Sequence, residues 1–339
     1  MKRFLYLIII VPLLALTGCN VHEWPEKPPM VPFHIDLKFD TAMGEQDYFH
    51  SRSSRSQAPT HDLRYVIRAY PVVGGTQEYE PAEEFIFTKT IQTFGQDYDY
   101  SVQLELPEGE YRLVVWADFV NPGSQEDKYY KRESFTGIVL QGKHAANTDY
   151  RDAFSGSHPL TLESTIVEGV EIQQTVIDMA RPLAKYTFIA TDLAEFIERE
   201  MERTGVYGTV SPEDFRLDDY RVMIYYPMYM PNTYNAFTDK AVNSSTGVQY
   251  QSQLTRLNDG EAAMGFDYVV INDDPDAKVT VRVGVFDKQG AQLILSPSFN
   301  IPLKRSVNTL VRGKFLVTES GGGISIDPSF NGDHNIVLP

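Results

Sequence analysis

The clearest signal in this sequence is the run Leu106-Pro107-Glu108-Gly109-Glu110-Tyr111-Arg112-Leu113-Val114-Val115-Trp116-Ala117-Asp118. Proline and glycine near its start are typical of a turn, and the residues that follow alternate as in a strand. The odd-numbered residues from Tyr111 to Phe119 are mostly apolar, and so are Val114 and Trp116 on the opposite face. A strand that is apolar on both faces is expected in the middle of a sheet. The run therefore predicts a turn followed by a central strand.

The same alternation predicts further strands on both sides of this run. In Phe33 to Phe39 the odd-numbered residues are apolar and the even-numbered ones are polar, the pattern of a half-buried strand. The other predicted strands are 63–73, 98–106, 166–179, 183–190, 220–226, 265–271, 279–287, 291–295, 307–317 and 324–326. Asp287-Lys288-Gln289-Gly290 has the length and composition of a hairpin turn.

One short helix is predicted after Thr191-Asp192. Asp192 is placed to cap its first turn, Glu195 to complete a capping box, and Gly205 to end it. The apolar stripe consists of Leu193, Phe196, Ile197 and Met201. With a single helix among many strands, the sequence predicts an all-β fold.

The length of 339 residues predicts about two domains, each able to bury a core. The boundary is placed at Arg181-Pro182, where a second strand pattern begins. The predicted organisation is a lipoprotein signal peptide (1–18), a lipidated proline-rich tether (19–30), an N-terminal β-sandwich domain (31–180) and a C-terminal β-sandwich domain (181–339) that contains the helix.

Cys19, the only cysteine, ends a bacterial lipoprotein signal. Lys2-Arg3 gives the positive start, Phe4 to Leu16 the apolar run, and Leu16-Thr17-Gly18-Cys19 the small residues at the cut. The apolar run is shorter than the roughly 20 residues of a membrane-spanning helix, so it is predicted to be cleaved. Lipid on Cys19 would then hold the protein on the outer membrane, with the chain exposed at the cell surface.

The net charge of −16 disfavours nucleic acid as a partner, because phosphates would be repelled. The seven histidines form neither an i, i+4 pair nor the helical zinc motif. Nucleophile elbows and phosphate-binding glycine loops are also missing from the sequence. We therefore predict no catalytic residues, no cofactor and no metal site, and a protein that is not an enzyme.

Two segments leave alternatives open. Carboxylates at Asp273-Asp274 and Asp276 could hold calcium through their oxygens, but Asn, Asp and Pro there are also typical of a solvated turn. The stretch Met228 to Tyr234, which includes Tyr229, could pack as core or loop, or form an exposed binding tip.

The order of several motifs resembles the fimbrium anchoring-subunit lipoproteins of type V pili. The motifs are the lipoprotein signal, the run 106–118, Arg181-Pro182-Leu183-Ala184-Lys185-Tyr186, Val311-Arg312-Gly313-Lys314-Phe315-Leu316 and Gly321-Gly322-Gly323-Ile324-Ser325-Ile326-Asp327-Pro328. The resemblance covers essentially the whole mature chain. It implies two tandem transthyretin-like (Ig-like) β-sandwich domains, an acylated N-terminus, and fimbrial subunits as partners bound by strand or edge complementation. The alternative is a surface lipoprotein that binds glycans or host proteins without forming a fibre.

The polar, serine-rich stretch 41–62 is expected to be a mobile loop that exposes Arg52 and Arg55. The resemblance suggests trimming there by an arginine-specific protease. Such a cut would leave the lipid joined to the body only through the pairing of strand 33–39. For an anchor, an uncut loop is therefore the preferred interpretation.

Overall fold

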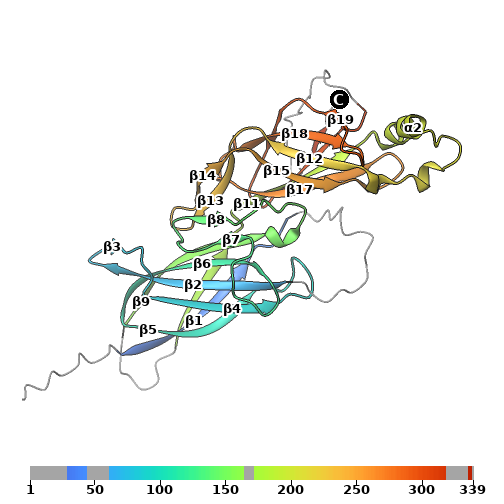
Figure 1. Cartoon of the computed structure of the whole chain (residues 1–339). Helices are drawn as coiled ribbons and strands as arrows, with labels where there is room; N and C mark the ends of the chain where they lie inside the picture. Colours follow the sequence, from blue (N-terminus) through green and yellow to red (C-terminus); the bar gives the residue numbers. More distant parts are fainter. Residues whose placement is uncertain (1–28, 44–60, 164–171, 318–334, 338–339) are drawn as a thin grey trace, which may run out of the picture.

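The computed structural model describes residues 29–43, 61–163, 172–317 and 335–337. The chain is all-β, as predicted, and α2 (Leu193–Thr204) is the one α-helix in these residues. Figure 1 shows the strands of the first half of the chain gathered at one end of the molecule and those of the second half at the other. Cys19, Arg52, Arg55 and the predicted strand 324–326 lie outside the described residues.

Two sheets form the first half of the structure. One has the order β10-β1-β5, and the other the order β3-β2-β6-β9, with β4 paired to β2. Their bounds are β1 (Met30–Phe39), β2 (Asp62–Val73), β3 (Thr76–Gln77), β4 (Glu83–Thr90), β5 (Tyr100–Pro107), β6 (Gly109–Val120), β9 (Ala153–Leu162) and β10 (Gln173–Met179). Apolar side chains from both sheets share one core, which makes this half a sandwich.

Strand β1 lies in the middle of its sheet. It runs parallel to β10, with Phe33 opposite Gln173, and antiparallel to β5, with Phe33 opposite Leu104. Its side chains Phe33, Ile35 and Leu37 are fully buried, which confirms the alternation seen in the sequence.

Strand β6 confirms the prediction of a central strand, because it pairs with β2 on one side and β9 on the other. The turn before it uses Gly109 at φ 153°, a conformation that favours glycine, and Tyr111 donates a hydrogen bond from its hydroxyl to the Pro107 carbonyl over 3.0 Å. The odd-numbered residues of β6 belong to the core of the first sandwich, whereas Val114 and Trp116 face a separate core. Both faces are apolar because the strand lies between two cores.

The second half is also a sandwich. Its sheets have the orders β16-β17-β11-β21-β22 and β15-β12-β18-β19, with β20 paired to β18, and side chains from both form one core. The bounds are β11 (Leu183–Ala190), β12 (Arg221–Tyr226), β15 (Val248–Gln253), β16 (Thr255–Arg256), β17 (Ala262–Val270), β18 (Lys278–Phe286), β19 (Gln292–Leu295), β20 (Phe299–Pro302), β21 (Asn308–Gly313) and β22 (Asn335–Val337). The predicted hairpin turn joins β18 to β19.

Helix α2 covers the end of this sandwich that lies away from the first half (Figure 1). Its apolar stripe is buried and Gly205 ends it in the left-handed conformation, as predicted. The predicted capping box is wrong, because the Asp192 carboxylate accepts hydrogen bonds from the backbone of Phe315, Leu316 and Val317 instead. Glu195 pairs with Lys314 over 3.0 Å. Both acidic side chains therefore attach the helix to the end of β21.

Four strands lie between the two sandwiches (Figure 1). They form the sheet β14-β13-β8-β7, with bounds β7 (Tyr130–Lys131), β8 (Ile138–Leu140), β13 (Met230–Asn235) and β14 (Lys240–Ser245). Strand β8 comes from the first half and β13 from the second, and Tyr234 lies opposite Ile138 in their pairing. The two halves therefore share a sheet.

Candidate functional site at the junction of the two halves

The junction has a hydrophobic core of its own. Trp116 of β6 lies at its centre, with its ring 5.2 Å from Tyr130 and 5.8 Å from Tyr234. The members from the first half are Val66, Tyr70, Val114, Trp116, Tyr130, Phe135, Ile138 and Ala153, and those from the second half are Leu183, Tyr234, Ala236, Phe237, Phe266, Tyr268 and Val270. Burial of aromatic and aliphatic side chains from both halves stabilises their contact.

A buried carboxylate, Asp267 of β17, lies next to this core. It pairs with Arg151, which lies between β8 and β9 in the chain, and with His144 over 2.6 Å. Tyr226 donates its hydroxyl to the same carboxylate over 2.5 Å, and the Tyr268 backbone N–H adds a further bond of 2.8 Å. Burial alone would raise the pKa of Asp267, but Arg151 and His144 outweigh it and the pKa lies below its usual range.

Two more ion pairs cross or border the junction. Arg181 binds Asp152 through two hydrogen bonds of 2.6 and 2.8 Å, and both side chains are buried. Lys185 pairs with Asp149 over 2.7 Å and lies 4.2 Å from the centre of the Phe266 ring. The sequence analysis places the start of a second domain at Arg181, but this side chain is bound to Asp152 of the first half. The domain limits themselves stay predictions.

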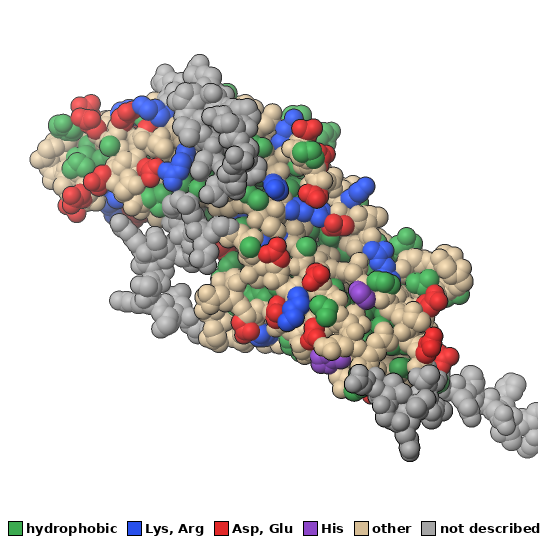
Figure 2. Space-filling model, turned by 180° about the vertical axis from the view of Figure 1, so that it is seen from behind, with side chains coloured by type: hydrophobic (Ala, Val, Ile, Leu, Met, Phe, Trp, Pro, Cys, Tyr) green, Lys and Arg blue, Asp and Glu red, His purple; other side chains and the backbone are tan. Residues whose placement is uncertain are grey.

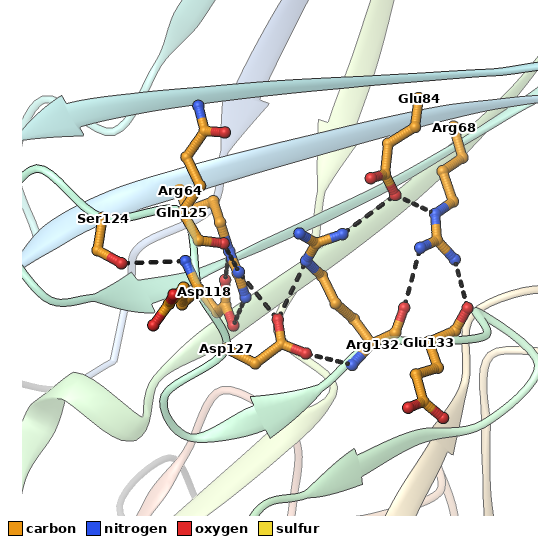
Figure 3. Close-up of polar contacts among 10 residues, drawn as sticks. Arg64, Arg68, Glu84, Asp118, Ser124, Gln125, Asp127, Arg132 and Glu133 are labelled. Atoms are coloured by element: carbon orange, nitrogen blue, oxygen red, sulfur yellow. Dashed lines mark hydrogen bonds and ion pairs between the residues drawn. The ribbon is translucent and has the colours of Figure 1, made fainter.

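A second charged network holds the segment that leads into β7 (Figure 3). Arg64 of β2 binds Asp118 of β6 through two bonds of 2.9 and 2.8 Å. The same guanidinium donates to Asp127 over 2.9 Å and to the Gln125 carbonyl over 2.6 Å. These bonds fix the loop after β6 against its own sheet.

The network continues along the surface of the first sandwich with charges of alternating sign (Figure 3). Asp127 pairs with Arg132 over 3.2 Å, and Arg132 with Glu84 over 3.1 Å. Glu84 also accepts from Arg68 over 2.5 Å. Burial would raise the pKa of Glu84, but Arg68 and Arg132 bring it below its usual range. Charged hydrogen bonds therefore attach the chain to the first sandwich on both sides of β7, at Asp127 before it and at Arg132 after it.

The structure places Asp273 to Asp276, where a solvated turn and a calcium site were both left open, in the turn between β17 and β18. There Asp274 accepts a hydrogen bond from the Asp276 backbone over 2.9 Å, and Asn272 accepts one from Ala241 over 2.8 Å. Within the described ranges, no three His, Cys, Asp or Glu side chains are grouped so that they could hold a metal ion. The segment is used as a turn.

In the stretch Met228 to Tyr234 some side chains are exposed, as in a binding tip, and others are buried, as in a core. Tyr229 is 69% exposed, whereas Tyr234 is 2% exposed and donates to Asp239 over 2.6 Å. A binding tip that includes Tyr234 is therefore wrong, because that residue belongs to the junction core.

Sequence reasoning missed the buried acids and bases of the junction. The available signal was Phe266-Asp267-Tyr268, in which an aspartate interrupts an otherwise apolar strand. Charged residues are almost never fully buried unless they are paired, so such an interruption indicates a partner elsewhere in the chain. The partners Arg151 and His144 lie more than a hundred residues away, so the pattern cannot name them.

The helices in the part of the chain that the structure describes are too short or too polar to cross a membrane.

Residues 29–339 match the model of a protein family that is described as a family of unknown function (DUF6562). No curated protein matches the chain. The chain is similar in structure to the fimbrial anchor protein Mfa2 from Porphyromonas gingivalis, at 12% identity over 80% of this chain and 82% of that one, with a TM-score of 0.38. It is also similar to a fimbrial assembly protein from Parabacteroides distasonis ATCC 8503, at 11% identity over 84% of this chain and 92% of that one, with a TM-score of 0.40. Fimbrial anchor and assembly proteins are thus among the solved structures that the chain is similar to.

Proposed function

The chain belongs to the family of unknown function DUF6562, and from its sequence and structure we propose that it is an outer-membrane lipoprotein that acts as the anchor or an accessory subunit of a fimbria-like assembly. One observation carries the proposal. The only cysteine, Cys19, stands at the end of a lipoprotein signal and is followed by a proline-rich stretch that leads into β1. A lipoprotein cysteine carries several acyl chains, and two or more are enough for durable attachment to a bilayer.

The position of β1 supports an arrangement in which the second half points away from the membrane. Strand β1 begins at Met30, and Figure 1 shows the start of this dark-blue strand at the end of the first sandwich that is remote from the second. A chain tethered there would present the second sandwich outward. Proline-rich tethers are semi-rigid, which would help to keep that orientation.

The junction supports a structural role for the protein. The shared sheet, the shared core and the buried ion pairs join the two sandwiches, so a load on one half would be passed to the other. Among the described residues, β14 and β19 end their sheets in the second half and offer edges to which a fibre subunit could add a strand.

The experiment compares Cys19→Ser with a control, Asn20→Ser, which keeps the cysteine. We expect Cys19→Ser to leave the outer-membrane fraction and cells to shed filaments into the medium, because the acyl chains are lost. Asn20→Ser should behave as the wild type. Normal outer-membrane retention and filaments in Cys19→Ser would contradict the anchor.

A second measurement separates the anchor from a surface lipoprotein that forms no fibre. Wild-type protein extracted from membranes with detergent should co-elute with fimbrial subunits. Lipidated protein that reaches the outer membrane but elutes without them would favour the fibre-free alternative.

A further inference from the structure

A cavity of about 310 Å³ opens at the junction, between the connector that follows β8 and the strands β13 and β15. The first half contributes Tyr129, the connector around Lys143 and His144, and the buried Arg151. The second half contributes Asn232 and the turn that enters β15. The cavity has the volume of a small ligand pocket and exists only because the two halves meet.

The charge of the cavity lining differs from that of the chain. Its ionisable cations are Arg151 and Lys143, His144 lies beside them, and its lining includes no aspartate or glutamate. The chain as a whole has a net charge of −16, and acidic and basic side chains are interspersed on the face shown in Figure 2. Because Arg151 and His144 already share the Asp267 carboxylate, Lys143 is the lining cation that has no counterion among the described residues, and its charge favours an anionic ligand.

Arg151 has hydrogen-bonding capacity that the described residues do not use. Its side chain is 2% exposed, and one terminal nitrogen pairs with Asp267, but the other, Nη2, is buried without a hydrogen-bond partner there. Buried donors are nearly always satisfied, so this nitrogen, on a residue that lines the cavity, indicates a missing acceptor. Lys143 is exposed at the cavity, and its ammonium group has no ion pair with any residue that the structure describes.

The rest of the lining suits a polyhydroxylated ligand. Gln141, Asn232 and Gln249 supply amides, which can both donate and accept hydrogen bonds. Leu140 and Val248 supply apolar surface beside them. Sugars present hydroxyl groups and C–H faces together, whereas a small inorganic anion would use neither the volume nor the apolar part.

We propose that this cavity binds one acidic sugar residue of the hexuronic acid type, with its carboxylate on the side of Arg151 and Lys143. This binding is independent of lipid attachment and of any fibre, so it goes beyond the function proposed above. It would allow a surface protein to recognise acidic glycans at the point where its two halves meet.

The test is isothermal titration calorimetry of the purified protein with glucuronate and galacturonate, and with glucose and galactose as neutral counterparts. Acetate and inorganic phosphate are titrated as simple anions. We expect at least about tenfold tighter binding of one hexuronate than of its neutral counterpart and of either simple anion. Equal binding of acidic and neutral sugars, or no binding of either, would overturn the proposal, and equally tight binding of acetate or phosphate would replace it with a general anion site.

Variants locate the binding in the cavity. Lys143→Ala should weaken hexuronate binding about fivefold, because an exposed ion pair contributes modestly, while the control Lys304→Ala removes an exposed lysine elsewhere and should change nothing. Gln249→Ala should weaken the binding of the same sugar without changing the melting temperature. Identical affinities in Lys143→Ala, Gln249→Ala and Lys304→Ala would overturn the assignment to this cavity.

Discussion

Arg64 and Arg151 are both buried arginines held by aspartates, but the surroundings of their partners differ. Arg64 binds Asp118, which is fully buried, and also Asp127, which is 24% exposed and continues into a chain of charges toward the surface. Arg151 binds Asp267, which is 0% exposed and is otherwise surrounded by His144, Tyr226 and a backbone N–H. The first site holds a loop to its own sandwich, and the second joins the two halves.

The two sites differ in how the buried charge of the arginine is compensated in the folded state. At the Arg64 site a second carboxylate shares the guanidinium, so the loss of one acid leaves another. At the Arg151 site one carboxylate serves several donors, and nothing else among the described residues carries a negative charge to that guanidinium. A buried ion pair that loses one partner leaves an uncompensated charge, which is far more costly than the pair itself is stabilising.

Asp267→Asn should therefore have the largest effect. We expect it to lower the free energy of unfolding by about 3–5 kcal/mol, because the Arg151 charge would stay buried without a counterion. Urea denaturation followed by intrinsic fluorescence measures this loss. The junction core lies beside the site, so the variant should also unfold in two transitions, one for each half; a loss below about 1 kcal/mol would contradict the role given to Asp267.

Asp118→Asn should have a smaller effect, of about 2–3 kcal/mol, because Arg64 keeps Asp127 and the Gln125 carbonyl. The matched control is Asp127→Asn, which changes the partly exposed acid of the same site and should cost about 1 kcal/mol. Both variants should keep a single transition, because this network lies within one half. A larger loss for Asp127→Asn than for Asp118→Asn would reverse our ranking of the two acids.

The smallest effect concerns pH. Burial, and next the charge of Lys128, lower the pKa of His61 to about 4, and the ring is stacked 3.7 Å from Tyr150. Because the unfolded chain binds a proton near pH 6.5 and the folded one only near pH 4, stability due to His61 is complete above pH 6.5 and is lost as the pH falls toward 4. We expect a loss of about 2 kcal/mol between pH 7 and pH 5, measured by urea denaturation at each pH. His61→Phe should flatten this part of the profile, and an unchanged slope would show that other groups cause it.

Much of the fold could be predicted from the sequence because strand alternation is a local pattern. The buried residues of β1 and the two apolar faces of β6 follow from residue order alone. The helix was found in the same way, from its stripe and its glycine stop. The hydrogen bonds at the start of the helix could not be predicted, because the backbone groups that donate to the Asp192 carboxylate belong to residues 315–317, far away in the chain.

The junction could not be predicted for a similar reason. Tyr234 and Tyr229 look alike in sequence, and only the pairing of β13 with β8 buries one of them. The cavity around Arg151 combines residues from 129–151 with residues from 230–249, and no spacing rule connects these ranges. Sequence patterns describe each sandwich, whereas the contact between the sandwiches depends on long-range geometry.

The central place of β1 in its sheet has a mechanical consequence. In the proposed lipoprotein, tension from the membrane would reach the folded chain at Met30, at the start of β1, and would pull this strand along its axis. The backbone hydrogen bonds to β10 and β5 run across that axis, so they would resist in shear, all together, instead of opening one after another. Phe33, Ile35 and Leu37 would also have to leave the core before the strand could slip. The attachment point is thus the part of the sheet best placed to bear a sustained pull.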